Sequence, residues 1–371
     1  MKLNRLINNL KNQIIRRKTN NFKSSIMNFI IDIPKKENFG EDASPTFIET
    51  ENKQISIIGV FDGMGGSGST LYIENEESHS GAYLASRTVK NVVEQFFEEQ
   101  LKDEIFVFSQ DKLPILKAKI VESLKNKLDK QQYEQSKIRS SLIRTFPTTI
   151  ALGIIYHVNS TIKIQAIWAG DSRIYFLSPK KGLVQLTKDD LKIENDPFQN
   201  IENDSPLSNM INLDEEFSLN YLEVEEQEPI LIFAATDGCF GYYSTPIHFE
   251  NIILKTMLNS MSFLEWQEKL SIEINKVSGD DFSLSLKSIV NDTNIDFKQF
   301  KIIYQNRFED LYREFMNEIN KIDEIVAGLK DKEVNLKIEI EQSELKRKQL
   351  FEKLWNSYKK TNYSLFNTNA Q

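Results

Sequence analysis

Acidic residues stand at the ends of several strand-like segments in this chain of 371 residues. They are Glu41 and Asp42 beyond Met27–Ile33, Asp62 after Gln54–Phe61, Asp237 after Pro229–Thr236, and Asp280 before Phe282–Val290. A single Asp-Gly pair is a common turn and carries little information. If the strands share one sheet system, however, these carboxylates converge, and clustered carboxylates repel one another unless a cation neutralises them.

The donor types in this set indicate which cation would serve. Carboxylate oxygens without a nearby Cys, in a chain with three His, favour hard ions such as Mg²⁺ or Mn²⁺ over zinc. Two such ions held ~3.5–4 Å apart act as a clamp for hydrolysis at phosphorus. The pattern therefore predicts an oxygen-lined metal site suited to phosphate chemistry.

The elements that must position these acids alternate between strands and helices. Besides the strands above, apolar periodicity predicts helices at His79–Leu101, Leu113–Leu128, Ile247–Met261 and Phe263–Lys276, and strands at Thr148–His157, Thr161–Trp168 and Arg173–Ser178. Ser67–Ser78 reads as a polar loop, and Asp189–Asn220 as a long loop or flap.

Bulk composition excludes several classes of protein. Hydrophobic residues make up 40% and charged residues 27%, as in a globular protein with a real core. A net charge of −8 argues against nucleic acid as a ligand. One cysteine excludes an intrachain disulfide and fits a reducing compartment. Because no apolar run approaches the ~18 residues of a membrane span, we predict a cytoplasmic protein without a transmembrane segment.

The two ends of the chain differ from its middle. Residues 1–25 predict a short basic amphipathic helix that either packs on the domain or makes weak contact with an anionic membrane surface. Residues 293–371 contain no proline and show apolar residues in steps of three and four. They predict two antiparallel helices with a break at Gly328–Asp331, serving either as a packing extension or as a coiled coil for a protein partner or self-association.

An ordered set of short motifs makes the chain resemble one family. They are Gly40-Glu41-Asp42-Ala43, Val60-Phe61-Asp62-Gly63-Met64-Gly65-Gly66, Phe146-Pro147-Thr148-Thr149, Ala169-Gly170-Asp171-Ser172-Arg173, Leu186-Thr187-Lys188-Asp189, Ala235-Thr236-Asp237-Gly238 and Gly279-Asp280-Asp281-Phe282-Ser283. Together they resemble the successive motifs of the metal-dependent protein phosphatases, protein phosphatase type 2C, in the bacterial style. The resemblance covers residues 26–292.

The resemblance implies an α+β fold, an αββα sandwich of two facing, mainly antiparallel sheets flanked by helices, with the C-terminal helical extension added. It also implies a site for two Mn²⁺ or Mg²⁺ ions and a weaker third. The implied catalytic residues are Asp62, Asp237 and Asp280, and the implied metal ligands are Glu41, Asp42, Asp62, Gly63, Asp171, Asp237 and Asp280. Asp62 would bridge the two ions.

Three positions depart from the family pattern. Glu37 stands where relatives often carry a phosphate-binding arginine, which leaves Lys35 or Lys36 as the candidate cation. Met64 stands where eukaryotic relatives have a histidine, so water must protonate the leaving group. Asp281 replaces the usual asparagine.

The resemblance implies a phosphatase that acts on phosphoserine or phosphothreonine in a protein substrate. Two alternatives remain open at this point. One is a catalytically weak regulatory protein with the same fold, acting through its C-terminal helices. The other is a two-metal hydrolase of a nucleotide or small phosphate ester.

Overall fold

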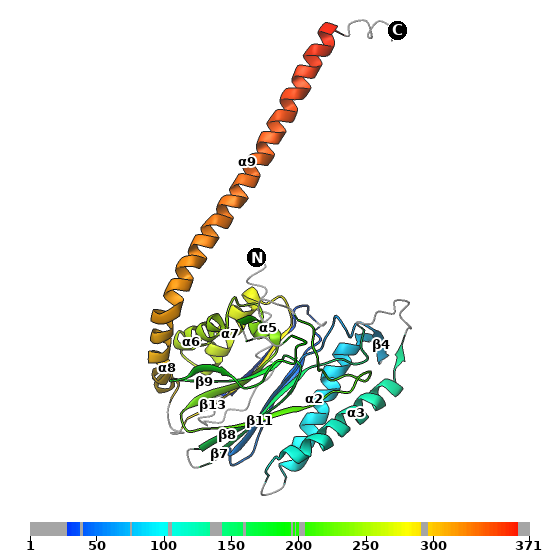
Figure 1. Ribbon diagram of the computed structural model, residues 1–371, viewed down its shortest axis with the longest axis vertical. Helices are drawn as coiled ribbons and strands as arrows, with labels where there is room; N and C mark the ends of the chain where they lie inside the picture. The colour runs from blue at the N-terminus through cyan, green and yellow to red at the C-terminus, as the bar shows by residue number, and fades with distance from the viewer. Residues whose placement is uncertain are drawn as a thin grey trace. The chain divides into compact units, whose positions relative to one another are not determined.

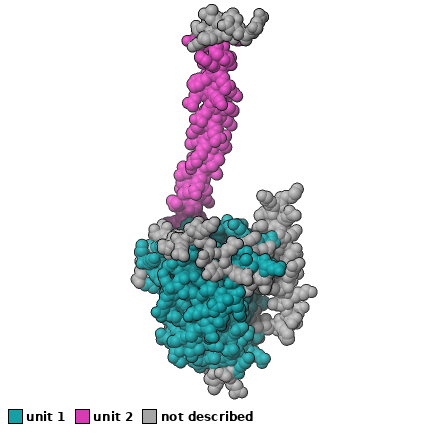
Figure 2. All heavy atoms as spheres, turned by 90° about the vertical axis from the view of Figure 1, so that its right-hand side faces the viewer, with its two compact units in different colours: residues 1–309 teal, residues 310–371 magenta. Residues whose placement is uncertain are grey.

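The computed structural model describes residues 28–37, 40–74, 76–102, 106–133, 143–158, 161–193, 196, 198–199, 205–290 and 296–362. The predicted basic helix of residues 1–25 lies outside this part of the chain. Two compact units are present, residues 1–309 and residues 310–371, which Figure 2 colours separately. None of the helices in the described part of the chain combines the length and the hydropathy that a membrane crossing requires.

Two five-stranded sheets face each other in the first unit (Figure 1). One sheet has the order β1 (Asn28–Ile33), β13 (Phe282–Ile289), β12 (Ile230–Ala235), β9 (Arg173–Ser178) and β10 (Gly182–Gln185). The other has the order β11 (Asn220–Glu226), β8 (Thr161–Ala169), β7 (Ile150–Val158), β3 (Ile55–Phe61) and β2 (Ala43–Glu49). All neighbouring strands in both sheets are antiparallel.

Helices cover the outer faces of both sheets. The β3 sheet is covered by α2 (Gly81–Gln100) and α3 (Leu113–Asp129), and the β13 sheet by α6 (Pro246–Leu258) and α7 (Phe263–Val277). Short turns, η1 (Gln110–Lys112) and α5 (Asp237–Phe240), complete the layers. This arrangement confirms the predicted α+β sandwich with four layers.

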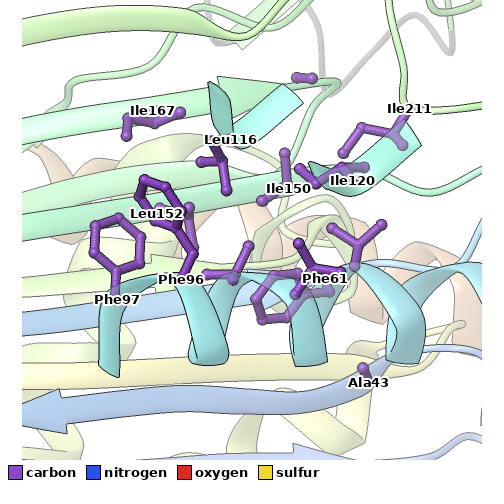
Figure 3. Close-up of a cluster of buried hydrophobic side chains, with 14 of the residues drawn as sticks. Ala43, Phe61, Phe96, Phe97, Leu116, Ile120, Ile150, Leu152, Ile167 and Ile211 are labelled. Atoms are coloured by element: carbon purple, nitrogen blue, oxygen red, sulfur yellow. The ribbon is translucent and has the colours of Figure 1, made fainter. Parts of the chain in front are cut away.

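Strand β3 shows why its sequence is a continuous apolar run. Successive side chains of a strand point to opposite faces. Ile58 and Val60 are therefore buried between the sheets, whereas Ile57 and Phe61 are buried under the helices. Figure 3 shows Phe61 in this second cluster, together with Phe96 and Phe97 of α2. Because both faces are buried, β3 is held firmly, and this fixes the position of Asp62, the residue that follows the strand.

Several strands were not predicted or were assigned wrongly. The segment interpreted as a polar loop forms β4 (Leu71–Glu74) and β5 (Glu77–Ser80), which pair with each other, and β4 also pairs with the short β6 (Gln132–Tyr133). Tyr72 explains why this segment forms strands instead of a loop, because its side chain is buried with its ring 5.0 Å from that of Phe146. Strand β11 was missed because it is an edge strand on which Glu223 and Glu225 are exposed and interrupt the apolar pattern.

The first unit extends beyond the boundary predicted at residues 292–293. Helix α8 (Phe297–Leu311) packs on this unit through Phe300 and Tyr304, which are fully buried. The Tyr304 hydroxyl donates a hydrogen bond of 3.1 Å to the Leu177 carbonyl, and Arg307 pairs with Glu250. The apolar periodicity continues without interruption past residue 309, so the sequence alone does not mark where the domain ends.

The second unit corrects the predicted helical hairpin. After a π-helical turn, η2 (Tyr312–Met316), one helix runs without a break as α9 (Asn317–Asn362). The predicted break at Gly328–Asp331 is wrong. A single glycine within a helix costs only about 1 kcal/mol, and its neighbours here are good helix formers with no proline among them.

Candidate metal centre

The acids predicted to converge come from both sheets. Asp62 follows β3 of one sheet, while Asp237 opens α5 after β12 of the other. Asp280 immediately precedes the β13 region, and Glu41 and Asp42 precede β2. The Thr236 hydroxyl joins the two sheets at this end by donating a hydrogen bond of 3.1 Å to the Asp42 carboxylate.

The electrostatics of these carboxyls show that they share one neighbourhood. Burial first, and then the charges of Asp42, Asp237, Asp171 and Asp280, raise the pKa of Asp62 well above its usual value. Burial followed by the charge of Asp280 raises the pKa of Asp237 to about 6. The structure therefore brings these predicted acids together.

Two further acids of the set respond in the same way. The pKa of Asp42 is raised well above its usual value by burial and by the charges of Asp281 and Asp237. The pKa of Asp171 is raised to about 8 by burial, by Asp237 and by Asp189. Repulsion of this kind is what a divalent cation would relieve.

The donor chemistry fits a hard cation, although the spacing is not that of a completed metal site. Among the described residues, no three or more His, Cys, Asp or Glu side chains are already arranged to hold a metal ion. Instead, after burial and the charge of Asp42, the charge of Asp237 raises the pKa of Asp62, so the carboxyls of Asp62 and Asp237 lie close to each other. Protonation of one of two neighbouring acids reduces their repulsion, and the same oxygens suit Mn²⁺ or Mg²⁺ when the proton leaves.

Glycines next to the acids allow the loops to approach closely. A Cβ atom on Gly63 would lie 2.4 Å from the carbonyl oxygen of Glu41, and one on Gly65 would lie 1.6 Å from the Glu41 carboxylate. On the opposite sheet, a Cβ atom on Gly238 would lie 1.9 Å from the carbonyl oxygen of Asp281. Any larger residue would push the acid-bearing loops apart.

The loop that carries Glu41 is held from α2 by a residue that sequence reasoning missed. Arg87 donates hydrogen bonds of 3.1 Å to the carbonyl oxygens of both Glu41 and Gly40. The hydroxyl of Ser86 also donates to the Glu41 carbonyl, and that of Ser80 donates to the Glu41 carboxylate. Because Arg87 lies 46 residues along the chain from Glu41, no local sequence pattern links the two.

Asp281 holds the same loop from the opposite sheet. Its two carboxylate oxygens accept hydrogen bonds of 2.6 Å from the backbone N–H groups of Lys35 and Glu41. An asparagine offers one acceptor oxygen instead of two, so it could satisfy only one of these amides. The departure from the family's asparagine thus has a structural role in this chain.

The two candidate phosphate-binding lysines differ in their surroundings. The Lys35 ammonium donates a hydrogen bond of 2.6 Å to the carbonyl oxygen of Ser278, and Lys36 is exposed. Within the described part of the chain, no hydrogen bond or ion pair joins either ammonium to the acid cluster.

Two more of the family-like motifs support Asp62 and Asp171. The backbone N–H and the hydroxyl of neighbouring threonines, Thr149 and Thr148, donate to the carbonyl oxygen of Asp62 at 2.9 and 2.5 Å. Beyond Asp171, the guanidinium of Arg173 forms a buried two-pronged pair with Asp189. This pair joins two motifs that are separate in the sequence.

Comparison with solved structures finds bacterial phosphatases of similar architecture. The serine/threonine phosphatase Stp1 from Staphylococcus aureus has 15% identity and a TM-score of 0.49, with 73% of this chain and 99% of that chain covered. PstP/Ppp from Mycobacterium tuberculosis has 15% identity and a TM-score of 0.47, covering 72% and 99%. A PstP catalytic domain solved with two manganese ions has 16% identity, a TM-score of 0.44, and the same coverage.

Comparison with family models gives the assignment. No curated protein matches the sequence. A family model described as protein phosphatase 2C matches residues 35–272, which includes all the predicted metal ligands except Asp280. The prediction that Asp280 is a metal ligand therefore rests on its proximity to Asp62 and Asp237, whose pKa values are raised by burial and also by the charge of Asp280. Because the matched region is more than half of the 371 residues, the chain belongs to the protein phosphatase 2C family.

Proposed function

We propose that this chain is a Mn²⁺- or Mg²⁺-dependent phosphatase that removes phosphate from phosphoserine and phosphothreonine in proteins. The observation that carries the proposal is the cluster of acids from five separate segments, in a chain of the protein phosphatase 2C family. When bound, two divalent cations would supply an activated water for attack on phosphorus.

Each acid has a proposed place in this site. Asp62, the carbonyl oxygen of Gly63, Asp237 and Asp280 would hold the first ion, and Asp62 together with Glu41 and Asp42 would hold the second. Asp171 would help to hold a weaker third ion. The raised pKa values of Asp62 and Asp237 support shared use of their oxygens, because each proton that leaves makes room for a cation.

Other residues position these ligands without touching the reacting atoms. Arg87 and Asp281 fix the loop that carries Glu41, from α2 and from the β13 sheet. Thr148 fixes the backbone of Asp62. A ligand set assembled from five segments needs such supports, because loss of outer partners typically weakens metal binding 10–100-fold.

In this proposal the segment with Lys35 and Lys36 binds the phosphate group, and water protonates the leaving group. Lys35 and Lys36 are the proposed cations for the phosphate; both are exposed, and the Lys35 ammonium also bonds the Ser278 carbonyl oxygen. Met64 has no proton to donate to the leaving group, so water must protonate it. A lysine is a point charge that lacks the two-pronged fork of an arginine, and we therefore expect modest affinity for the phosphate group.

Several finer features belong to the same proposal. The single cysteine fits a reducing compartment, and we propose a cytoplasmic location and a role in signalling by reversal of protein phosphorylation. Retention of every predicted metal-site acid supports an enzyme rather than an inactive regulatory protein with the same fold.

Phosphate release from phosphoserine and phosphothreonine peptides tests the proposal. We expect release with Mn²⁺ present, none after chelation, and a loss of about a thousandfold in Asp62→Asn, because several kcal/mol of transition-state stabilisation depend on the metal site. Asp129→Asn, which removes an exposed carboxylate at the end of α3, is the matched control and should retain full activity. Metal-dependent hydrolysis of p-nitrophenyl phosphate without activity on any phosphopeptide would instead indicate a small phosphate ester as substrate.

A further inference from the structure

Helix α9 carries a line of exposed apolar side chains. They recur at alternating steps of four and three residues and comprise Ile322, Val326, Leu329, Leu336, Ile340, Leu350 and Leu354. Each is between 41% and 60% exposed. This spacing is the heptad pattern by which helices pack against other helices. We call these residues, together with Glu333, Ser343 and Arg347 in the same register, the α9 seam.

The two charged residues of the seam discriminate between partner orientations. In a parallel, in-register pair of α9 helices, Glu333 would face Glu333 of the second copy, and Arg347 would face Arg347. Like charges in such central positions are costly, and they are a common device for specifying register and orientation. In an antiparallel pair, Glu333 of one copy lies within reach of Arg347 of the other.

The charged residues that flank the centre of the seam agree with this orientation. An antiparallel pair centred between residues 341 and 342 places Lys337 opposite Glu344 of the second copy, and Glu339 opposite Lys346. A parallel pair would instead oppose Glu339 with Glu344, and Lys332 with Lys337. Charge complementarity across the flanking positions sets helix orientation in coiled coils, and here it favours the antiparallel one.

A shallow groove marks the centre of this arrangement. It is lined by Leu336, Glu339, Ile340, Ser343, Glu344 and Arg347. Ser343 is small, and in the antiparallel register Ile340 of the second copy lies against it. The two-fold axis repeats the same contact with the copies exchanged, so one surface of α9 is complementary to itself.

We propose that α9 pairs with α9 of a second copy of this chain as an antiparallel, two-fold symmetric dimer. About 40 residues of each helix overlap, a length of about 60 Å, and Leu329 packs against Leu354 at both ends of the core. The exposed pairs within α9, such as Lys337 with Glu333 at 2.7 Å, are weak and exchange readily. The proposed dimer does not depend on the proposed activity.

The mass of the full chain in solution is the first test. We expect light scattering to give twice the chain mass of 43.1 kDa, falling toward the monomer on dilution. A monomer at every concentration would overturn the proposal, as would a mass of four chains. The second of these outcomes would mean that the apolar residues outside the seam, Val334, Ile338 and Leu345, are also covered.

Charge reversal tests the orientation. Glu333→Arg and Arg347→Glu should each weaken dimerisation about tenfold or more, since every chain then opposes like charges across the centre. The double variant should restore wild-type affinity, because the pair of opposite charges is re-formed with its signs exchanged. In a parallel dimer each of these residues faces its own counterpart, so the single and double variants would all oppose like charges as the wild type does and would dimerise about equally; that result would refute the antiparallel arrangement.

Disulfide trapping gives an independent readout. Chains carrying Leu329→Cys are mixed with chains carrying Leu354→Cys; the native Cys239 is 1% exposed and does not compete. Oxidation should join position 329 of one chain to position 354 of another in the mixture, and neither variant alone should form much product. Efficient cross-linking of Leu329→Cys chains with themselves would contradict the proposal.

Discussion

Helices α2 and α9 are both amphipathic, yet they use their apolar faces differently. The apolar residues of α2, including Val93, Phe96 and Phe97, are buried against the β3 sheet and α3 (Figure 3). The corresponding residues of α9 are exposed; Leu336, for example, is 57% exposed. The same periodicity in sequence thus describes a helix that completes a domain core and a helix whose apolar side remains available.

This difference indicates where each helix obtains its stability. Most helical stability in proteins comes from the packing of an apolar face rather than from intrinsic propensity. Helix α2 gains this stability within its own chain and in turn positions the acid loop through Arg87. In the proposed dimer, α9 gains this stability from a second copy, and we therefore expect substitutions in the two helices to act on different measurable quantities.

Shortening an apolar side chain should have the largest effect, and that effect should differ clearly between α2 and α9. Phe97→Ala should lower the unfolding free energy of the first unit by about 3–5 kcal/mol, because it leaves a cavity at a fully buried site. Leu350→Ala should leave that unfolding free energy unchanged and weaken only association. Chemical denaturation and light scattering on both variants provide the check. A comparable loss of first-unit stability from Leu350→Ala would show that α9 packs on its own domain.

Removal of the link between α2 and the acid loop should affect metal binding next most strongly. Arg87→Ala should weaken Mn²⁺ binding about 10–100-fold, since supporting partners of metal ligands typically contribute that much. Activity should recover when Mn²⁺ is raised. Arg87→Lys should recover only part of the affinity, because a lysine cannot fork between the Gly40 and Glu41 carbonyls. Glu98→Ala, on the exposed side of α2, is the control without effect.

A rise in pH should destabilise the metal-free first unit and leave the stability of α9 unaffected. The folded-state pKa values of Asp237, about 6, and Asp171, about 8, lie above the usual value of 3.8. The folded state therefore binds more protons than the unfolded chain between pH 4 and 8, and its stability falls as pH rises through this window. We expect a loss of about 1–2 kcal/mol, since neighbouring acids share protons and the separate shifts do not add.

Thermal unfolding in the presence of chelator at several pH values measures this effect. Saturating Mn²⁺ should remove the loss at high pH, and Asp171→Asn should reduce it without metal. Stability of the metal-free protein that rises from pH 5 to pH 8 would be inconsistent with a cluster of buried, mutually repelling acids.

The smallest expected effect concerns the continuity of α9. No atom lies within 4 Å of a Cβ atom placed on Gly328. Gly328→Ala should therefore stabilise the helix by about 1 kcal/mol and strengthen association slightly. Circular dichroism during heating measures the first effect. A loss of helicity would instead indicate that Gly328 forms a turn.

Sequence reasoning recovered the parts of this molecule that local patterns encode. Acids next to glycines at strand ends predicted the cluster around Asp62, and alternating or helical periodicity predicted most strands and helices of the first unit. It missed contacts between distant residues, such as those of Arg87 and Asp281 with the Glu41 loop. It also placed a break at Gly328, because a glycine that ends a helix and one that lies within it look the same in sequence.

Calorimetric titration of the full chain with Mn²⁺ tests the central claim most directly. We expect binding of at least two ions by the wild-type protein at neutral pH, with release of protons from the acid cluster. Asp62→Asn should lose the tight binding of both ions, because its carboxylate is proposed to bridge them, while Asp129→Asn should bind as the wild type does. Absence of Mn²⁺ binding, or unchanged binding by Asp62→Asn, would contradict the account.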